Sequence, residues 1–253
     1  MKTVILVLTL TGCAHDTDER SEGDPGSLPD RSGDFDSDSP SDSPGDGQAD
    51  TGNDGEQPVE DGPAPVYPPS SGECPDLTKS HTSSFYSSGE ERVVTSIVPD
   101  DPPDGMPLVF FFHGLLDPGS TPQPTDYMAR ALGLQDAANE HGVAFILPQS
   151  GILDRFGIRF FMWAAEEFEG PDVVLYDDLR GCADDQLSVD LYNVHAMGFS
   201  GGALFTTVIA RDRGDTLASI VEMSGGSDID MLTFEDPLSA YKTSENPMPA
   251  LLI

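Results

Sequence analysis

Positive charge is scarce in this chain of 253 residues. Twelve lysine and arginine residues stand against 45 aspartate and glutamate residues, and the formal net charge is -33. The excess is not confined to one segment, because residues 14–72 hold 16 acidic and 2 basic side chains and residues 73–253 hold 29 and 9. A surface this acidic repels nucleic acids and anionic lipids. We therefore exclude nucleic acid as a partner and interpret the acidic groups as a solvated surface.

The apolar run at the N-terminus is short. It covers Thr3 to Leu10 after the basic start Met1-Lys2, which is too little to span a bilayer and is typical of an export signal. Leu10-Thr11-Gly12-Cys13 resembles the lipobox of bacterial lipoproteins, which implies that Cys13 is acylated and becomes the first mature residue. We predict a signal peptide at 1–13 and a lipid anchor in the cell envelope or on the cell surface, with plain secretion as the alternative.

Core-forming residues are almost missing from residues 14–72. Asp, Ser, Gly and Pro dominate there, as in the run from Asp34 to Pro44. Such a segment cannot bury enough apolar surface to offset the entropy of folding, so we predict a disordered, self-repelling linker. The alternating aspartates do not follow the ligand order of an EF-hand, and no calcium site is expected.

Cysteine is rare as well. Once Cys13 is lipidated, only Cys74 and Cys182 remain. In an exported protein such a pair suggests a disulfide. Cys182 also falls on the apolar side of a helical pattern, where a free cysteine behaves as a small hydrophobic residue. The sequence leaves both possibilities open.

Residues 73–253 alternate between strand-like and helix-like patterns. We predict strands at 92–99, 107–114, 143–148, 191–197, 217–223 and 249–253, and helices at 126–140, 173–187 and 203–211. Repeated strand–helix units with short links predict an α/β domain with a mostly parallel sheet covered by helices. Functional groups are expected on the loops that follow the C-terminal ends of the strands.

Gly198-Phe199-Ser200-Gly201-Gly202 reads G-x-S-x-G between a predicted strand and a predicted helix. That context predicts a sharp turn that exposes the hydroxyl of Ser200 as a nucleophile. The oxyanion hole is expected from backbone N–H groups near Gly114 or Leu115 and from that of Gly201. His113 is expected to be structural, because the catalytic histidine of such chains follows the serine in the sequence.

Residues 73–253 resemble an α/β-hydrolase of the poly(3-hydroxybutyrate) depolymerase and feruloyl esterase group. The resemblance rests on Arg92 with Val98-Pro99, Pro107-Leu108-Val109 with His113-Gly114, Tyr176-Asp177-Asp178-Leu179, Val189-Asp190, the segment 198–202 and Ser224-Gly225-Gly226. It implies hydrolysis of an ester, in some members a polymeric one, through an acyl-enzyme on Ser200. It implies no metal and no organic cofactor.

A catalytic histidine after Ser200 is the main absence. The last histidine, His195, lies on the predicted nucleophile strand and is expected in the core, and Asp228 and Asp230 are weak candidates for the acid. Without a base the serine hydroxyl is barely nucleophilic. We therefore expect a chain that stops before its last strand or strands, with acid and histidine beyond Ile253, and that is inactive as given.

Two other functions remain open at this stage. One is a non-catalytic surface protein, derived from a hydrolase, that binds a polymer or a glycan. The other is peptidase or acyltransferase activity, since a fold does not fix its chemistry. The aromatic residues Phe156, Phe160, Phe161 and Trp163 are expected either to line an apolar pocket or to pack in the core.

Overall fold

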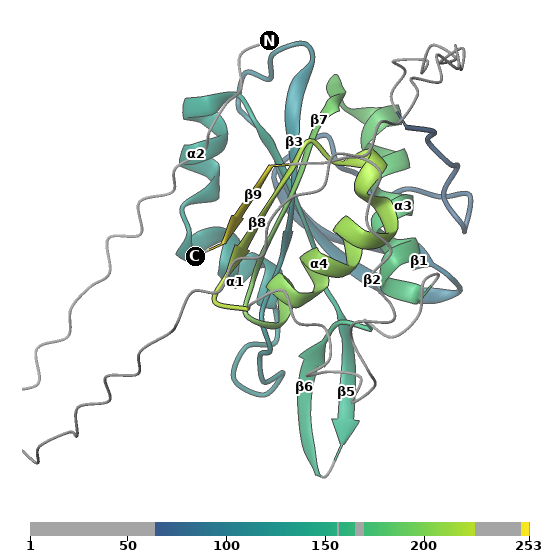
Figure 1. Ribbon diagram of the computed structural model, residues 1–253, viewed down its shortest axis with the longest axis vertical. Helices are drawn as coiled ribbons and strands as arrows, with labels where there is room; N and C mark the ends of the chain where they lie inside the picture. Colours follow the sequence, from purple (N-terminus) through teal and green to yellow (C-terminus); the bar gives the residue numbers. More distant parts are fainter. Residues whose placement is uncertain (1–63, 156, 165–169, 226–248, 253) are drawn as a thin grey trace, which may run out of the picture. The chain divides into compact units, whose positions relative to one another are not determined.

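The computed structural model describes residues 64–155, 157–164, 170–225 and 249–252, which are coloured in Figure 1. The predicted signal peptide, Cys13 and the linker up to residue 63 lie outside the described residues. The described residues belong to one compact unit, which spans Pro58–Ile253.

A seven-stranded sheet forms the centre of this unit, with the strand order β1-β2-β4-β3-β7-β8-β9. The strands are β1 (His81–Ser87), β2 (Glu90–Ile97), β3 (Met106–Phe112), β4 (Ala144–Pro148), β7 (Val189–Phe199), β8 (Ser219–Met223) and β9 (Ala250–Leu252). Strand β2 pairs antiparallel with both β1 and β4. Every pair from β4 to β9 is parallel. The prediction of a mostly parallel sheet is confirmed.

Helices cover both faces of this sheet. They are α1 (Pro124–Ala131), α2 (Leu134–His141), α3 (Pro171–Gln186) and α4 (Gly201–Arg213), with a short 3-10 helix at Gly214–Thr216. In Figure 1, α1 and α2 lie on one side of the sheet and α3 and α4 on the other. Successive side chains of β3 point to opposite faces of the sheet, so this strand contributes buried residues to both faces. Leu108, Phe110 and Phe112 belong to the core that includes the apolar side chains of α3 and α4, whereas Val109 and Phe111 are buried on the opposite face.

The helix predicted at 126–140 is two helices, α1 and α2. Gly133 separates them with a left-handed backbone, at a φ of 62°. Glycine adopts that conformation without the clash that a Cβ would cause, so it ends one helix and lets the next begin. The continuous apolar spacing of the sequence does not reveal this break.

The stretch between the strand predicted at 143–148 and the helix predicted at 173–187, to which the sequence analysis assigns no helix or strand, contains a hairpin. Strands β5 (Gly151–Arg155) and β6 (Ile158–Met162) pair antiparallel, and the hairpin extends away from the seven-stranded sheet (Figure 1). The backbone N–H of Phe161 donates a 2.9 Å hydrogen bond to the oxygen of Leu116. The base of the hairpin is therefore attached to the segment that follows β3.

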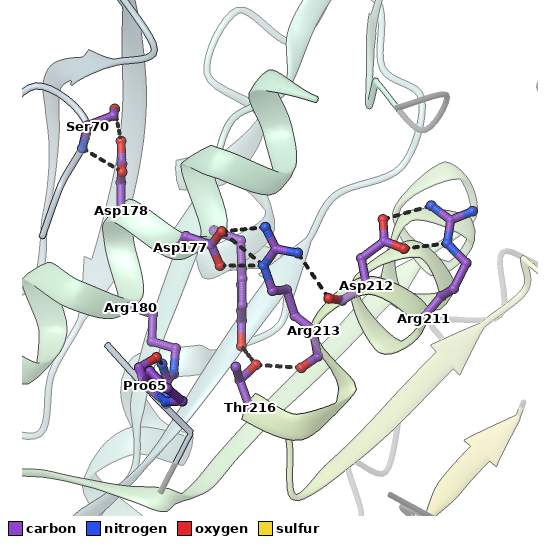
Figure 2. A network of polar contacts seen from close by, with 10 residues as sticks. Pro65, Ser70, Asp177, Asp178, Arg180, Arg211, Asp212, Arg213 and Thr216 are labelled. Carbon is purple, nitrogen blue, oxygen red and sulfur yellow. Dashed lines mark hydrogen bonds and ion pairs between the residues drawn. The ribbon is translucent and has the colours of Figure 1, made fainter. Parts of the chain in front are cut away.

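The folded region begins earlier than residue 73, because residues 64–72 contact α3. The backbone N–H and the hydroxyl of Ser70 both donate to the carboxylate of Asp178, at 2.8 and 2.5 Å (Figure 2). Arg180 donates to the oxygen of Pro65 at 2.9 Å. These contacts use mainly backbone groups of the linker, which the composition of a segment does not report. Residues 64–72, which the sequence analysis assigns to the linker, therefore pack against the folded region.

A disulfide attaches the same segment to α3. It joins Cys74 to Cys182, with 5.5 Å between the two Cα atoms. Close by, a Cβ on Gly181 would lie 2.6 Å from the backbone oxygen of Tyr67, so the segment runs directly over the helix at a glycine. One turn further on, the amide oxygen of Gln186 accepts the backbone N–H of Leu77 at 2.9 Å, and its Nε2 donates to the oxygen of Pro75 at 2.8 Å. We call residues 64–77 the strap.

Candidate active site

Ser200 lies at the turn between β7 and α4 in a strained backbone conformation, at a φ of 53°. Its backbone N–H donates to the oxygen of Met223 at 2.8 Å, and its own oxygen accepts from Ala203 at 2.9 Å in the first turn of α4. A non-glycine residue at positive φ persists only where its surroundings hold it there, and such residues gather at functional sites. This is the sharp strand–turn–helix geometry that the sequence predicts for Ser200.

The glycines of the motif allow three backbone segments to meet at this turn. A Cβ on Gly198 would lie 2.1 Å from the backbone oxygen of Gly202, and a Cβ on Gly202 would lie 2.0 Å from that of Phe112. No side chain fits at those distances, and the atoms in the way belong to the backbone. The two glycines therefore let the start of α4 lie against the ends of β7 and β3.

The segment after β3 lies beside Ser200. A Cβ on Gly114 would be 3.2 Å from the Cβ of Ser200 and 3.1 Å from the backbone oxygen of Phe199. A Cβ on Gly201 would be 3.5 Å from the backbone nitrogen of Leu115. The structure thus brings together the four residues that the sequence analysis selected from two distant segments. The side chains of Leu115 and Phe199 flank the turn and are about half exposed.

His113 is buried, and both nitrogens of its ring contact residues other than Ser200. Its Nδ1 lies 2.7 Å from the oxygen of Gly114, and its Nε2 accepts the backbone N–H of Ser150 at 3.1 Å. The ring therefore carries its proton on Nδ1 and is neutral. Burial lowers its pKa to about 4. His113 links the ends of β3 and β4, which is a structural role.

Trp163 and Phe161 are core residues. Trp163 stacks on Phe205 of α4 with ring centroids 4.7 Å apart, and it meets Phe112 edge to face at 5.2 Å. Its Nε1–H donates to the backbone oxygen of His113 at 2.8 Å. Phe161 is also buried, whereas Phe156 lies outside the described residues. Of the two interpretations open from the sequence, core packing holds for Trp163 and Phe161.

His195 of β7 is half-buried, and its ring is hydrogen-bonded to side chains of the sheet. Its Nδ1 lies 2.7 Å from the hydroxyl of Ser219 and its Nε2 lies 2.8 Å from the amide oxygen of Asn193. Burial lowers its pKa. Both ring nitrogens are therefore committed to partners other than Ser200. The two weak candidates for the acid, Asp228 and Asp230, lie outside the described residues.

Two buried carboxylates were not anticipated from the sequence. Glu222 of β8 accepts a 2.5 Å hydrogen bond from the hydroxyl of Thr207, and burial raises its pKa. Asp172, in the first turn of α3, pairs with Arg92 and accepts the backbone N–H of Ala164 at 2.6 Å. The available signals were weak: an acid in an otherwise apolar strand, and an aspartate directly after the helix-starting Pro171.

Within the described ranges, no group of three or more His, Cys, Asp or Glu side chains is arranged to hold a metal ion. None of the helices described is both long enough and apolar enough to cross a membrane.

The strand order, the helices on both faces and the turn at Ser200 together make this the α/β-hydrolase fold. No protein-family model matches the chain, and no curated protein sequence matches it. Solved structures with the same type of fold do match. The chain is 20% identical to S-formylglutathione hydrolase from Staphylococcus aureus, where the match covers 62% of this chain and 61% of that one with a TM-score of 0.44.

Two further solved structures are similar to the chain. For a thermostable esterase the identity is 19%, the match covers 70% of this chain and 46% of the other, and the TM-score is 0.47. For a ferulic acid esterase the identity is 15%, the cover is 63% of each chain, and the TM-score is 0.47. The chain therefore spans less than two thirds of the length of each of the three. The fold assignment rests on the strand order and on the turn at Ser200, and not on these likenesses.

Proposed function

We propose that this protein is a serine hydrolase of carboxylic esters that reacts through an acyl-enzyme on Ser200. The observation that carries the proposal is the strained turn that holds Ser200, with the backbone of Gly114 and Leu115 directly beside it. A serine held in this way has its hydroxyl free of the strand–helix packing, and amide groups lie close by for the charge that develops on a reacting carbonyl.

The oxyanion hole in this proposal consists of the backbone N–H groups of Leu115 and Gly201. Gly114 has no side chain, so the backbone approaches the reacting carbonyl closely. Loss of one donor of this kind typically raises the barrier by about 3 kcal/mol. Since both donors are backbone groups, their position depends on the loop that carries them and not on a side chain that could be replaced.

The base and the acid come, in this proposal, from residues outside those described. Both ring nitrogens of His113 and of His195 already have other partners. A serine without a base reacts slowly with esters at neutral pH. The chain of 253 residues alone should therefore be a poor esterase. We call the full product of its reading frame, with any residues that follow Ile253, the continued polypeptide, and we propose that it is a good esterase.

We propose a polyester or a feruloyl ester as the substrate, because residues 73–253 resemble polyester depolymerases and feruloyl esterases. The half-exposed Leu115 and Phe199 beside the serine agree with an ester that has an apolar part.

We further propose that the protein is exported and anchored to a membrane through lipid on Cys13. The disulfide between Cys74 and Cys182 supports export, because disulfides persist in oxidising compartments.

The experiment compares hydrolysis of p-nitrophenyl butyrate, methyl ferulate and a peptide by the chain of 253 residues, the continued polypeptide and its Ser200→Ala variant. Ester hydrolysis by the continued polypeptide that Ser200→Ala abolishes supports the proposal. Peptide cleavage without ester cleavage would replace it with a peptidase. Binding of polyester or glycan without any hydrolysis would favour the non-catalytic alternative.

Lipid attachment is tested separately, in bacterial cells that express the chain with its N-terminus. Incorporation of labelled palmitate that Cys13→Ser removes supports the anchor. Equal labelling of both proteins, or release of the unlabelled protein into the medium, contradicts it.

A further inference from the structure

We infer that Asp172 is a positioning residue for the oxyanion loop, which we define as residues 113–115. The inference rests on the proposed function, in which this loop supplies an N–H group to the reacting carbonyl. Asp172 does not contact the loop itself. It acts through the backbone of Ala164, the indole of Trp163 and the backbone of His113.

The first step is a buried carboxylate with both oxygens occupied. Asp172 is 2% exposed, and its Oδ1 pairs with Nη2 of Arg92, which is 6% exposed. Its Oδ2 accepts the backbone N–H of Ala164 at 2.6 Å. The position in the first turn of α3 favours a negative charge, because the N-terminus of a helix carries partial positive charge. Asp172 thereby links β2, α3 and the end of the β5–β6 segment.

The second step is the residue next to Ala164. Trp163 is 2% exposed and stacks on Phe205, which fixes the plane of its indole ring. A bond on the backbone N–H of Ala164 fixes the other end of the same residue. Held from both ends, the indole Nε1–H lies 2.8 Å from the backbone oxygen of His113.

The third step is the oxyanion loop. The backbone oxygen of His113 is fixed by Trp163, and its ring is fixed by Gly114 and Ser150. The peptide groups that follow carry the N–H groups beside Ser200. A shift of the indole would therefore move the loop on which the donors lie.

A contribution to stability does not by itself explain the buried ion pair between Arg92 and Asp172. Desolvation offsets much of the attraction between two buried charges, and apolar residues of similar volume are often equally stable. The Nε of Arg92 is moreover buried without a hydrogen-bond partner in the described structure. What an apolar pair would not supply is an acceptor for the N–H of Ala164.

Two double variants separate the acceptor from the charges. Arg92→Leu with Asp172→Asn keeps an amide oxygen for Ala164, whereas Arg92→Leu with Asp172→Leu removes it, and neither leaves a lone buried charge. Trp163 is the only tryptophan of the chain, so its emission reports directly on this site. We name each double variant by its change at position 172. We expect the Asn variant (Asp172→Asn) to keep the parental emission maximum and acrylamide quenching, in contrast to the Leu variant (Asp172→Leu). We expect the Leu variant to show a red-shifted, more quenchable indole.

In the continued polypeptide, the Leu variant should also lose activity through kcat and not through KM. A misplacement of about 1 Å can cost about 100-fold in rate. If the Leu variant does not fold, Asp172→Glu serves instead, because it keeps the charge and displaces the oxygens by one methylene group. Like the Leu variant, Asp172→Glu should shift the Trp163 emission to the red and lower kcat.

Asp177→Asn is the matched control. Asp177 lies on the same helix and forms an ion pair with Arg213 at 2.8 Å, which is more exposed than the pair of Asp172 with Arg92 (Figure 2). The pair with Arg213 connects α3 to the end of α4 and not to Trp163. The control should lower the melting temperature while the Trp163 emission and kcat stay at the parental values.

Identical Trp163 emission in both double variants and the parent would overturn the inference, as would an equal change in the Asp177→Asn control. The emission does not depend on hydrolysis. A failure of the proposed function, seen as activity that survives Ser200→Ala, is therefore distinguishable from a failure of this inference.

Discussion

The indole N–H of Trp163 donates a 2.8 Å hydrogen bond to the backbone oxygen of His113, whose ring in turn bonds Gly114 and Ser150. The only tryptophan of the chain thus reports on the segment that lies beside Ser200. Fluorescence can follow the candidate site without any substrate, and the first prediction below uses it.

Gly198→Ala should disrupt the turn at Ser200. The new Cβ would lie 2.1 Å from the backbone oxygen of Gly202 and 2.5 Å from the hydroxyl of Thr206. The backbone cannot move aside without displacing α4, so we expect a loss of about 3 kcal/mol in the free energy of unfolding. Urea denaturation followed by Trp163 emission measures it.

The control for that substitution is Gly151→Ala, where nothing lies within 4 Å of the added Cβ. Its stability should stay within about 0.5 kcal/mol of the parent. Equal urea midpoints for the two variants would show that the close approach at Gly198 is not required.

His113 should make the fold sensitive to acid. Burial lowers its pKa from 6.5 to about 4, so between these values the unfolded chain binds a proton that the folded chain does not. The linked stability is fully present above pH 6.5 and is lost as the pH falls toward 4, by about 3 kcal/mol in total. His113→Asn removes this titration. Urea midpoints measured between pH 6.5 and pH 4 should fall more steeply for the parent, and equal slopes would contradict the assignment.

Glu222→Gln should stabilise the protein at neutral pH. Burial raises the pKa of Glu222 above its ordinary 4.5, so the charged carboxylate is less favourable in the folded chain than in the unfolded one. Stability linked to this group is present below pH 4.5 and falls as the pH rises through the higher pKa. Glutamine keeps the shape and an acceptor for Thr207 without the charge.

The expected result is a higher melting temperature for Glu222→Gln near neutral pH and no gain in acid. Glu91→Gln, at an exposed position of β2, is the matched control and should change little at either pH. A loss of stability at neutral pH for Glu222→Gln would mean that the carboxylate is needed in its charged form.

Reduction of the disulfide should loosen the strap. Cys74 and Cys182 are 108 residues apart, and a loop of that length restricts the unfolded chain by about 4 to 5 kcal/mol in the entropic account. Hydrogen exchange should rise in residues 64–77 and in α3 when a reductant is added. The same reductant should leave a Cys74→Ser, Cys182→Ser variant unchanged, and a parental protein that exchanges equally with and without reductant would contradict the prediction.

Local patterns are sufficient for most strands of the sheet and for the turn at Ser200, but they do not reveal β1. The apolar run of β3 and the G-x-S-x-G turn are periodic or short-range signals, and both indicate the structure that forms. Breaks that depend on one backbone conformation, such as the left-handed Gly133, were not visible. The strap was missed for a related reason, since its contacts with Asp178 and Arg180 involve backbone groups that no residue pattern marks.

The long-range polar contacts around the site also cannot be predicted from the sequence. Arg92 and Asp172 are 80 positions apart, and Trp163 reaches His113 across 50 positions. Each residue alone has an ordinary reading: an arginine in a strand, an aspartate at a helix start, an aromatic in a loop. Only the fold brings them into one chain of bonds behind Ser200.

The most direct measurement of the central claim is the mass of the acyl-enzyme. The continued polypeptide is mixed with p-nitrophenyl butyrate, quenched in acid during the first turnover, and digested for mass spectrometry. We predict one added butyryl group, on the peptide that contains Ser200, and none in the Ser200→Ala variant. Turnover without a butyryl group on that peptide, or with one on another residue, would contradict the assignment of Ser200 as the nucleophile.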